Sequence, residues 1–386
     1  MLRPTARPVL DAIGYHTGSQ RTVIVAGFRG ALESHARLSS SSRHHEHVVR
    51  RAGHARAPQR ATRTRLPAGQ FRSRRLGVVV TADDLESVVL SAEERSAVIA
   101  RATHEVTFAI DGLACRVTFE DASAAVAYRA RYALNDVAGQ SAIHICVARD
   151  PSGRWLFVHC DGESKRWRDE SCSTDLLICL ADAFALTAFF RAVPHLMSMH
   201  AAVVGIEGGA AAIVGDSIAG QTTTAVACAR RGLRLYSDER LVLSRRQVVP
   251  FPRTLTIRPG GIRLLLDAPL NDWVARRLAD ASAATNVAYG ELLGEWSAPP
   301  VEPLRSAFII AAIGSSPYVE RIARTHVAQA ALARAHCVEI GTDRFTRLLA
   351  ALEGVACYRL TLGSPHDTAD LIENRLRADM RRARAA

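Results

Sequence analysis

The residues from 199 to 249 constrain the fold more than any other stretch of the sequence. Apolar residues run from Ala201 to Val214 around a glycine-containing turn, which predicts a two-stranded hairpin. The second strand leads into a glycine-bounded loop, 215–220, and a helix is expected at Thr222–Arg231. The next predicted strand, Leu233–Tyr236, ends at a pair of acidic residues. The stretch therefore predicts a strand, a loop, a helix, a strand and an acidic pair, in that order.

Such an order of elements can hold a nucleoside triphosphate. Backbone N–H groups of the loop and the N-terminus of the helix face the phosphates, because both carry partial positive charge. A hydroxyl in the first helical turn, here Thr222, can contact Mg²⁺, and the acidic pair Asp238-Glu239 can complete a metal or base site. The residues expected to contact the nucleotide are Gly215, Asp216, Ser217, Ala219, Gly220, Gln221, Thr222 and Thr223.

The same segment resembles a known family. Roughly residues 190–376 are similar to the kinase domain of HPr serine kinase/phosphorylase and its HPr-kinase-related relatives, whose fold is similar to that of phosphoenolpyruvate carboxykinase. The most specific part is His200, a P-loop that begins 15 residues later, and an acidic pair 16 residues after Thr222. The motifs that carry the resemblance are Met199-His200-Ala201-Ala202, the loop Gly215 to Thr222, Arg231-Gly232-Leu233-Arg234-Leu235, Ser237-Asp238-Glu239, Pro250-Phe251-Pro252-Arg253 and Cys357-Tyr358-Arg359-Leu360.

This resemblance implies an activity and its cofactors. The family transfers a phosphoryl group from Mg-ATP to a serine or threonine hydroxyl, so ATP and Mg²⁺ are expected, with a protein or peptide as acceptor. By resemblance, Asp238 is the general base and His200 lies near the phosphates, while Thr222 and Glu239 hold Mg²⁺. The chain is therefore expected to be a serine/threonine kinase of the HPr-kinase-related type, acting on an unidentified acceptor.

The loop departs from the P-loop pattern at two positions. Gln221 occupies the position of the phosphate-binding lysine, and a neutral amide cannot neutralise charge on a transferred phosphoryl group. Ile218 stands where the relatives usually have glycine, and a β-branched residue disfavours a positive φ. A nearby arginine, Arg253 or Arg258, could supply the missing charge. The alternative to an active kinase is a catalytically impaired nucleotide sensor or a binding scaffold.

The individual residues also have purely structural interpretations. Thr222 could serve only as a helix N-cap, and the acidic pair could be a solvated strand end. His200 could be an ordinary hydrogen-bonded residue at the start of a strand. The sequence leaves these alternatives open.

Residues 77–196 are expected to form a small α/β domain without catalytic residues of its own. Apolar residues near a spacing of 3.6 predict a helix at Asp83–Thr103, and Asp111-Gly112 predicts a hairpin turn. A second hairpin is expected between residues 142 and 160. Ser173 or Thr174 then caps a long apolar helix that ends near Val193.

The N-terminal tail carries the excess positive charge. Residues 1–76 contain 15 arginines and three acidic residues, whereas the rest of the chain is nearly neutral. We expect this tail to be disordered, although its composition also resembles an organellar transit peptide or a nucleic-acid-binding tail. The folded part offers no basic groove, so nucleic-acid binding is not expected there. The expected class is α/β: a disordered tail (1–76), a small α/β domain (77–196) and an HPr-kinase-like nucleotide-binding domain (197–386).

The cysteines and the hydropathy restrict the setting in which the chain works. The eight cysteines form no Cys-x-x-Cys pair and no zinc-finger spacing, so we expect scattered core thiols in a reducing compartment. The most apolar run, Leu176–Phe190, is shorter than the roughly 20 residues of a membrane helix and contains Asp182. We find no signal peptide and expect a cytoplasmic protein without membrane contact. A homo-oligomer is compatible with the resemblance.

Overall fold

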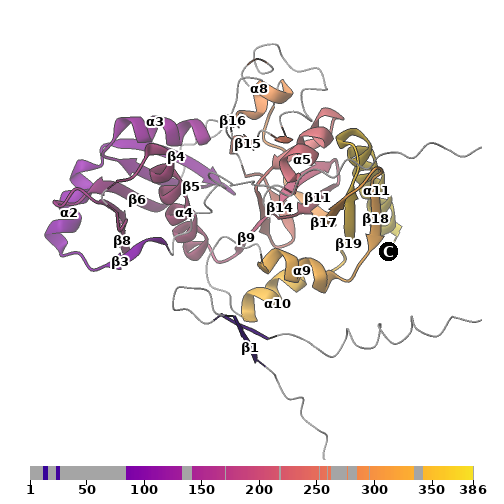
Figure 1. The fold of residues 1–386 in the computed structure, drawn as a ribbon, viewed down its shortest axis with the longest axis horizontal. Coiled ribbons are helices and arrows are strands. Elements are labelled where there is room, and N and C mark those ends of the chain that lie inside the picture. Colours follow the sequence, from indigo (N-terminus) through magenta and orange to yellow (C-terminus); the bar gives the residue numbers. More distant parts are fainter. Residues whose placement is uncertain are drawn as a thin grey trace, which may run out of the picture. The chain divides into compact units, whose positions relative to one another are not determined.

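The computed structural model describes most of the chain beyond residue 83 (Figure 1). The chain divides into two compact units, residues 1–74 and 75–386. The first unit contains two short antiparallel strands, β1 (Ala12–Tyr15) and β2 (Val23–Ala26). Residues 1–76 were expected to be disordered, and this hairpin corrects that expectation for residues 12–15 and 23–26. The other residues of that segment lie outside the described residues. The described residues are 12–15, 23–26, 84–132, 141–169, 171–216, 219–251, 253–258, 260–261, 276, 285–294, 296–333 and 342–385.

A mixed six-stranded sheet organises residues 84–169 (Figure 1). Its order is β3-β8-β7-β6-β5-β4, and all neighbours are antiparallel except β5 and β6. The expected Asp111-Gly112 turn joins β4 to β5, and both residues have the positive φ that such a turn needs, 54° and 76°. The second expected hairpin, β6 to β7, is also confirmed. The strands are β3 (Glu86–Val88), β4 (His104–Ile110), β5 (Leu113–Phe119), β6 (Ser141–Arg149), β7 (Trp155–His159) and β8 (Ser164–Arg166).

Helices pack on both faces of this sheet. On one face, α3 (Ala122–Arg131) and α4 (Thr174–Ala192) bury the apolar side chains of β4, β5 and β6. On the other face, α2 (Ala92–Arg101) packs over a smaller cluster that includes Leu156 and Val158 of β7. Successive side chains along each strand therefore point into one or the other of two apolar layers, because both faces of the sheet are buried.

The start of α2 corrects the helix expected at Asp83–Thr103. The hydroxyl of Ser91 accepts a hydrogen bond from the Glu94 N–H (3.1 Å), and the Glu94 carboxylate accepts one from the Ser91 N–H (2.8 Å). This reciprocal pair fixes the first helical turn at Ala92. The residues before it form β3 instead, so the apolar spacing alone placed the start too early.

The helix α4 is the buried helix that the sequence predicted. Its N-cap is Ser173, whose hydroxyl accepts a hydrogen bond from the Leu176 N–H. It includes Asp182, which is 5% exposed and is paired with basic residues. None of the helices in the described part of the chain is long and apolar enough to cross a membrane.

A second, nine-stranded mixed sheet lies within residues 196–362. Its main order is β12-β10-β11-β17-β14-β13-β9, and the long strand β17 also pairs in parallel with β19, which pairs with β18. Two further strands, β15 and β16, come between β14 and β17 along the chain and form a separate antiparallel pair. The strands are β9 (Leu196–His200), β10 (Ala202–Ile206), β11 (Gly209–Val214), β12 (Arg234–Ser237), β13 (Arg240–Ser244), β14 (Gln247–Val249), β15 (Leu255–Ile257), β16 (Thr285–Val287), β17 (Glu302–Ile313), β18 (Tyr318–Arg321) and β19 (Ala356–Leu362).

This sheet is also covered on both faces. Ala211 and Ile213 of β11 face one apolar cluster, which contains the helices α5 and α11 and the short α8. Ala210 and Ala212 face the opposite cluster, which contains α9 and α10. The helices are α5 (Gln221–Arg230), α8 (Tyr289–Leu293), α9 (Arg324–Ala333), α10 (Thr342–Ala351) and α11 (Pro365–Ala385).

The order of elements expected around the glycine-bounded loop is confirmed. A hairpin of β10 and β11 leads through the loop into α5, and β12 follows. The helix α5 begins at Gln221, one residue before the expected start. The fold is therefore α/β with mixed sheets, as the sequence predicted at that level.

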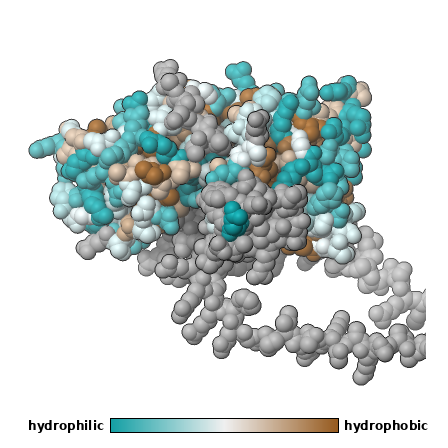
Figure 2. All heavy atoms as spheres, turned by 90° about the horizontal axis from the view of Figure 1, so that it is seen from above, coloured by the Kyte–Doolittle hydropathy of each residue, from teal (hydrophilic) through white to brown (hydrophobic). Residues whose placement is uncertain are grey.

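One face of the described surface is mainly hydrophilic. Figure 2 shows hydrophilic side chains over most of the described surface on that side, with hydrophobic residues in small separate spots. The strongly exposed large hydrophobic residues come from different elements, and scattered single residues of this kind are normal on a protein surface. They are Val89, Val126, Val301, Ile313 and Tyr318.

Candidate functional site

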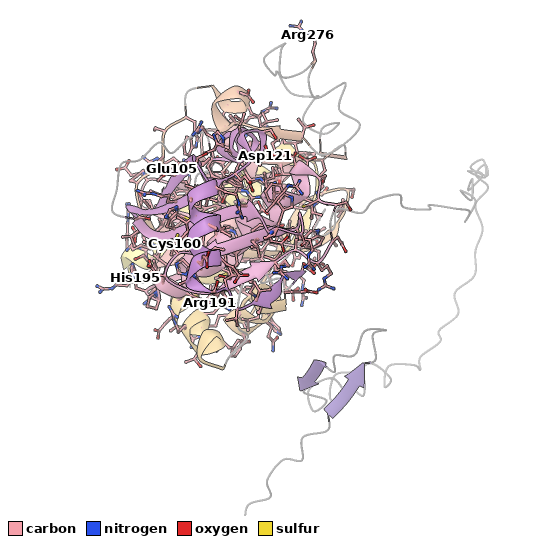
Figure 3. The ribbon with its side chains drawn as sticks, turned by 90° about the vertical axis from the view of Figure 1, so that its left-hand side faces the viewer. Glu105, Asp121, Cys160, Arg191, His195 and Arg276 are labelled. Atoms are coloured by element: carbon pink, nitrogen blue, oxygen red, sulfur yellow. The ribbon has the colours of Figure 1, made fainter. Side chains whose placement is uncertain are left out.

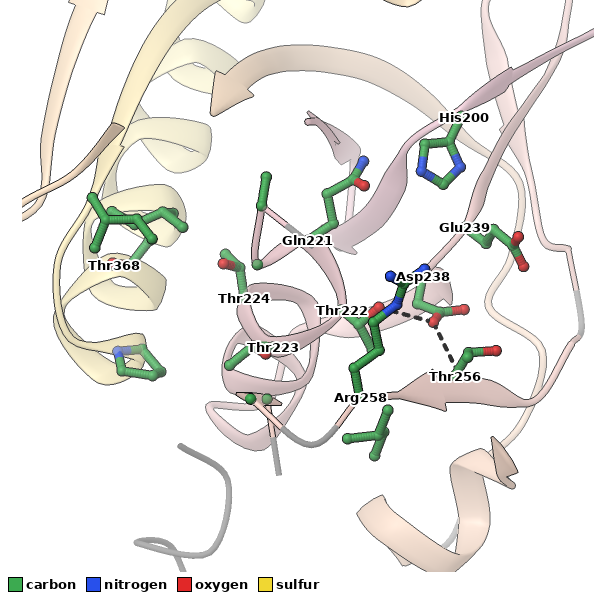
Figure 4. A pocket seen from close by; sticks show the side chains of 18 of the residues that line it. His200, Gln221, Thr222, Thr223, Thr224, Asp238, Glu239, Thr256, Arg258 and Thr368 are labelled. Carbon is green, nitrogen blue, oxygen red and sulfur yellow. Dashed lines mark hydrogen bonds between the residues drawn. The ribbon is translucent and has the colours of Figure 1, made fainter. Parts of the chain in front are cut away.

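A cavity of about 640 Å³ opens where the loop before α5 meets the end of β12 (Figure 4). It brings together nine of the residues that the sequence singled out, Arg258 among them. Gly215 and Asp216 do not line it, and Ser217 and Ile218 lie outside the described residues. The lining residues are His200, Ala219, Gly220, Gln221, Thr222, Thr223, Thr224, Asp238, Glu239, Thr256, Ile257, Arg258, Gly260, Gly261, Ile313, Leu362, Gly363, Pro365 and Thr368.

The loop turns into α5 at Gly220, which has a φ of 101°. A side chain at this position would be strained, so glycine is required by the backbone. No side chain caps α5, and its first-turn N–H groups have no partner within the helix. A helix start of this kind favours an anion, because the helix dipole and the N–H groups both attract negative charge.

Gly215 packs against residues of the loop and of α5 and does not line the cavity. A Cβ atom there would lie 3.1 Å from Ile310, 3.2 Å from Gln221 and 3.3 Å from Ala219. These contacts are tighter than side chains normally tolerate. Gly215 therefore allows the chain to leave β11 closely packed against the start of α5.

Gln221 is directed toward the strand behind the loop. Its Nε2 donates a hydrogen bond to the Ile213 carbonyl oxygen (3.0 Å), and its side chain is buried, although it contributes to the cavity wall. Figure 4 shows the side chain extending from the start of α5 away from Thr222. The amide thus satisfies a backbone acceptor of β11, and the lysine position provides no positive charge.

Asp238 is the most unusual carboxylate of the cavity. It is 4% exposed, and its Oδ2 accepts hydrogen bonds from the Thr222 hydroxyl (3.2 Å) and the Thr256 N–H (3.3 Å). Its Oδ1 is buried and has no hydrogen-bond partner among the described residues. Burial, and then the negative charge of Glu239, raise the pKa of Asp238 to about 7.

Glu239 behaves in the opposite way. Its carboxylate accepts a hydrogen bond from Arg253, with which it forms an ion pair. Burial opposes its charge, but the attraction of Arg253, followed by those of Arg240 and His200, lowers the pKa of Glu239 to about 2. Since its side chain is 33% exposed, solvent screens part of this attraction. The adjacent acids therefore differ: Asp238 can exchange a proton near neutral pH, and Glu239 stays charged.

The turn that carries the acidic pair is shaped by Ser237. Its hydroxyl accepts hydrogen bonds from the N–H groups of Glu239 (3.2 Å) and Arg240 (2.9 Å). His200 approaches from the end of β9, which pairs with β13 in a register that sets His200 opposite Arg240. The structure thus brings His200 to the cavity wall beside the acidic pair.

The two arginines considered as replacements for the lysine occupy different places. Arg253 is 6% exposed and pairs with Glu239 and with Asp182 of α4 (3.1 Å), and it does not line the cavity. Arg258 does line the cavity, and Figure 4 shows it extending toward Thr222 and Asp238. Arg258 is therefore the arginine that can meet an anion in this cavity.

Sequence reasoning did not find Thr256. Its backbone N–H donates to the Asp238 carboxylate from β15. This strand has only three residues, which is too few for a sequence pattern to predict its pairing. Sequence reasoning also missed the contribution of α11, whose first residues close one side of the cavity. No local signal marks these residues, because they reach the site only through the tertiary fold.

No protein-family model matches this sequence, and no curated protein matches it. The interpretation of the cavity therefore depends on its own residues: an open helix start, a hydroxyl bonded to a buried acid, a second acid that stays charged, and an arginine.

Proposed function

We propose that this chain binds Mg-ATP in the cavity at the start of α5 and transfers a phosphoryl group to a serine or threonine hydroxyl of a protein or peptide. The observation that carries the proposal is the buried Asp238, whose pKa of about 7 lies close to the operating pH. A general base is most effective when its pKa is near that pH. The HPr-kinase-like fold and the cytoplasm, where ATP is available, are parts of the same proposal.

The proposed role of Asp238 is to accept the proton of the acceptor hydroxyl. Its Oδ2 is held by Thr222 and Thr256, which fixes the orientation of the carboxylate. Its Oδ1 is buried without a partner among the residues that the structure describes, so a proton transferred to it would satisfy an otherwise unpaired oxygen. Glu239 keeps the proton affinity of Asp238 high by placing a second negative charge beside it.

The residues present fit the divalent metal that such a reaction needs. Mg²⁺ prefers oxygen ligands, and the cavity offers the Thr222 hydroxyl and the Glu239 carboxylate. When bound, Mg-ATP supplies the phosphoryl group and a metal charge that offsets the charge of its phosphates. Thr222 and Glu239 are the proposed metal-holding residues, and the phosphates are proposed to face the N–H groups of residues 219–223.

Arg258 is the proposed source of positive charge. Gln221 is neutral and is bonded to Ile213, so the lysine position cannot provide this charge. Arg258 lies on the cavity wall and extends toward Asp238. A guanidinium group binds phosphate oxygens in a bidentate way, so one arginine can both orient and neutralise a phosphate.

A second candidate is a nucleotide sensor or scaffold that binds ATP without transferring phosphate. The hydrogen bond between Gln221 and Ile213 favours this candidate, because it stabilises the loop without any charge for the transition state. Both candidates require nucleotide binding, and they differ only in whether Asp238 takes part in a reaction.

Calorimetric titration of Mg-ATP into the full chain, with a transfer assay on serine- and threonine-containing peptides, tests the proposal. We expect saturable binding and slow transfer. Asp238→Asn should reduce transfer about a hundredfold or more while changing the ATP affinity little. The control is Asp169→Asn, an exposed aspartate outside the cavity.

The outcomes separate the candidates. Binding with no transfer above the level of Asp238→Asn supports the sensor or scaffold. Absence of binding at millimolar Mg-ATP rejects both candidates. Equal transfer by Asp238→Asn and the unchanged chain would show that Asp238 is not the base.

A further inference from the structure

Three side chains of types that commonly bind metals meet on one face of the six-stranded sheet. His144 and Cys146 are two residues apart on β6, so they point to the same face. Cys160 follows β7, and its N–H donates a hydrogen bond to the His144 carbonyl oxygen (2.9 Å), which puts it across from His144. Figure 3 labels Cys160 in this part of the molecule. The cluster lies outside the cavity at α5 and does not depend on the function proposed for it.

Two of the three distances within the cluster are close to those of a tetrahedral zinc site. The Sγ atom of Cys146 lies 3.6 Å from the Sγ atom of Cys160 and 3.6 Å from Nε2 of His144. All three ligand atoms lie within 4.8 Å of one another. Zinc bonds of about 2.3 Å to sulfur and about 2.0–2.1 Å to nitrogen give tetrahedral edges of about 3.8 Å between two sulfurs and about 3.6 Å between sulfur and nitrogen.

The surroundings of the cluster suit a bound cation. Cys146 is fully buried, and its neighbours include Val158 and the side chain of Val98 from α2. Polar groups that face an apolar layer are unfavourable unless they are paired or coordinated. His144 and Cys160 are partly exposed, so an ion and a water molecule can reach the cluster from solvent.

Thr118 provides the kind of supporting contact that metal sites have. Its hydroxyl donates to Sγ of Cys146 (3.2 Å); it also lies 3.1 Å from Nε2 of His144, a contact that a metal bound at Nε2 would replace. A hydroxyl that donates to a metal-bound thiolate fixes its orientation and is a frequent partner of such ligands.

We propose that His144, Cys146 and Cys160 bind one zinc ion through Nε2 and the two Sγ atoms, with water in the fourth position. Both thiols bind as thiolates, so two thiolates and a neutral imidazole leave the site without net charge. Any thiol that is protonated beforehand releases its proton to solvent. The ion joins β6 to the segment after β7, next to the face covered by α2.

A disulfide between the two cysteines is the main competing use of this cluster. Both cysteines are free thiols, and their sulfur atoms are well beyond the distance of about 2.05 Å for a disulfide bond. A disulfide would not involve Nε2 of His144, which lies 3.6 Å from Sγ of Cys146. The three-residue convergence therefore favours a metal.

Metal binding to the full chain tests the proposal. The reduced, chelator-treated protein is titrated with Zn²⁺ by calorimetry and with Co²⁺ by absorption spectroscopy, where a cobalt–thiolate charge-transfer band reports bound sulfur. We expect one equivalent of metal, a charge-transfer band, and a higher melting temperature with Zn²⁺, because a ligand of the native state stabilises it. Cys146→Ser and Cys160→Ser should each lose the band, and His144→Ala should weaken binding at least about tenfold.

Cys172→Ser is the matched control, since Cys172 is a partly exposed free thiol away from the cluster. It should retain the metal and the band. No stoichiometric binding by the unchanged chain would overturn the proposal, and so would equal binding by Cys146→Ser. A peptide crosslink between Cys146 and Cys160 in protein purified without reductant, together with no metal uptake after reduction, would assign the cluster to a disulfide instead. The unchanged chain gives the decisive measurement even where a variant fails to fold.

Discussion

The hydroxyl of Thr222 donates a hydrogen bond to Oδ2 of Asp238 across 3.2 Å, which joins the first turn of α5 to the end of β12. One partner belongs to the anion-attracting start of a helix, and the other is a buried acid with a pKa raised to about 7. In the proposed function, phosphate binding and proton transfer would therefore be coupled through this contact. Changes at either residue should alter both properties.

Removal of the Thr222 hydroxyl should change the titration of Asp238. The hydrogen bond from Thr222 stabilises the charged carboxylate and lowers its pKa, so Thr222→Ala should raise the pKa of Asp238 above its present value of about 7. A carbon-detected NMR titration of the aspartate carboxyl groups measures this directly. The pH–rate profile of any transfer reaction should shift upward with it.

Thr222→Ser retains the donor and is the control for this experiment. It should keep the titration of Asp238 close to that of the unchanged chain, whereas the alanine variant should not. An identical titration midpoint in all three proteins would mean that the contact does not affect the carboxylate.

The pH dependence of stability should report the raised pKa of Asp238. Its pKa of about 7 exceeds the ordinary value of 3.8, so the native state binds more protons than the unfolded state between these values. The contribution of Asp238 to stability is therefore fully present below about pH 4 and is lost as the pH rises through about 7. Asp238→Asn removes this loss, so at pH 8 it should be more stable than the unchanged chain by at least about 1 kcal/mol.

Urea unfolding at pH 5 and pH 8 measures this difference. The comparison between the two proteins cancels the other titrating groups. Glu239 acts in a separate window, because its lowered pKa gives stability that is lost only as the pH falls from about 4.5 toward 2. The exposed Asp169→Asn should show no such change, and an equal loss of stability in Asp238→Asn would contradict the raised pKa.

The local elements of the candidate site were predictable from the sequence, because they depend on neighbouring residues. The glycine-bounded loop, α5 and the acidic pair after β12 follow from apolar runs and a few glycines. The direction of the Gln221 side chain did not follow, because it depends on how closely the Ile213 carbonyl oxygen of β11 approaches the start of α5. The ion pair between Arg253 and Asp182 could not be predicted from the sequence either, since Asp182 lies 71 residues away in α4.

The cluster of His144, Cys146 and Cys160 could be found only from the pairing register of two strands, because the spacing of its residues along the sequence matches no metal-binding motif. The cysteines lack zinc-finger spacing, and the sequence therefore predicted scattered thiols. The hairpin of β6 and β7 pairs Ile145 with His159, which sets the next residue, Cys160, opposite His144. The sequence predicted this hairpin, and the cluster would have been found if the register had been followed along both strands from the turn at residues 150–153.

A lysine at position 221 should increase the affinity for nucleotide. Gln221 lies at the start of α5 and contributes to the cavity wall, so Gln221→Lys adds a cation where the phosphates are proposed to bind. A charged hydrogen bond contributes about 1.5–3 kcal/mol, so the dissociation constant for Mg-ATP should fall about tenfold or more. A calorimetric titration compares the two proteins.

Gln221→Met is the control, because it removes the hydrogen bond to Ile213 without adding charge. It should bind Mg-ATP no better than the unchanged chain and should be less stable, since it removes a buried hydrogen bond. An increase in affinity for both variants would assign the effect to the released loop rather than to charge.

The arginine Arg253 should be critical for stability. It is 6% exposed and lies between two carboxylates, those of Glu239 and Asp182, and Arg131 also approaches Asp182 (3.7 Å). Arg253→Met leaves buried negative charge without its main partner, which should lower the free energy of unfolding by about 3 kcal/mol or more. Denaturant unfolding measures this loss.

A comparison with an exposed ion pair separates burial from charge. Arg359 pairs with Glu320, and both side chains are 52% exposed, so Arg359→Met should cost no more than about 1 kcal/mol. The double variant Arg253→Met with Asp182→Asn should be less destabilised than the sum of the single variants, because the unpaired charge is then absent. Loss of Arg253 also removes the attraction that keeps Glu239 ionised and that opposes the raised pKa of Asp238. A stable Arg253→Met with unchanged Asp238 titration would therefore show that the buried pairs do not control the cavity.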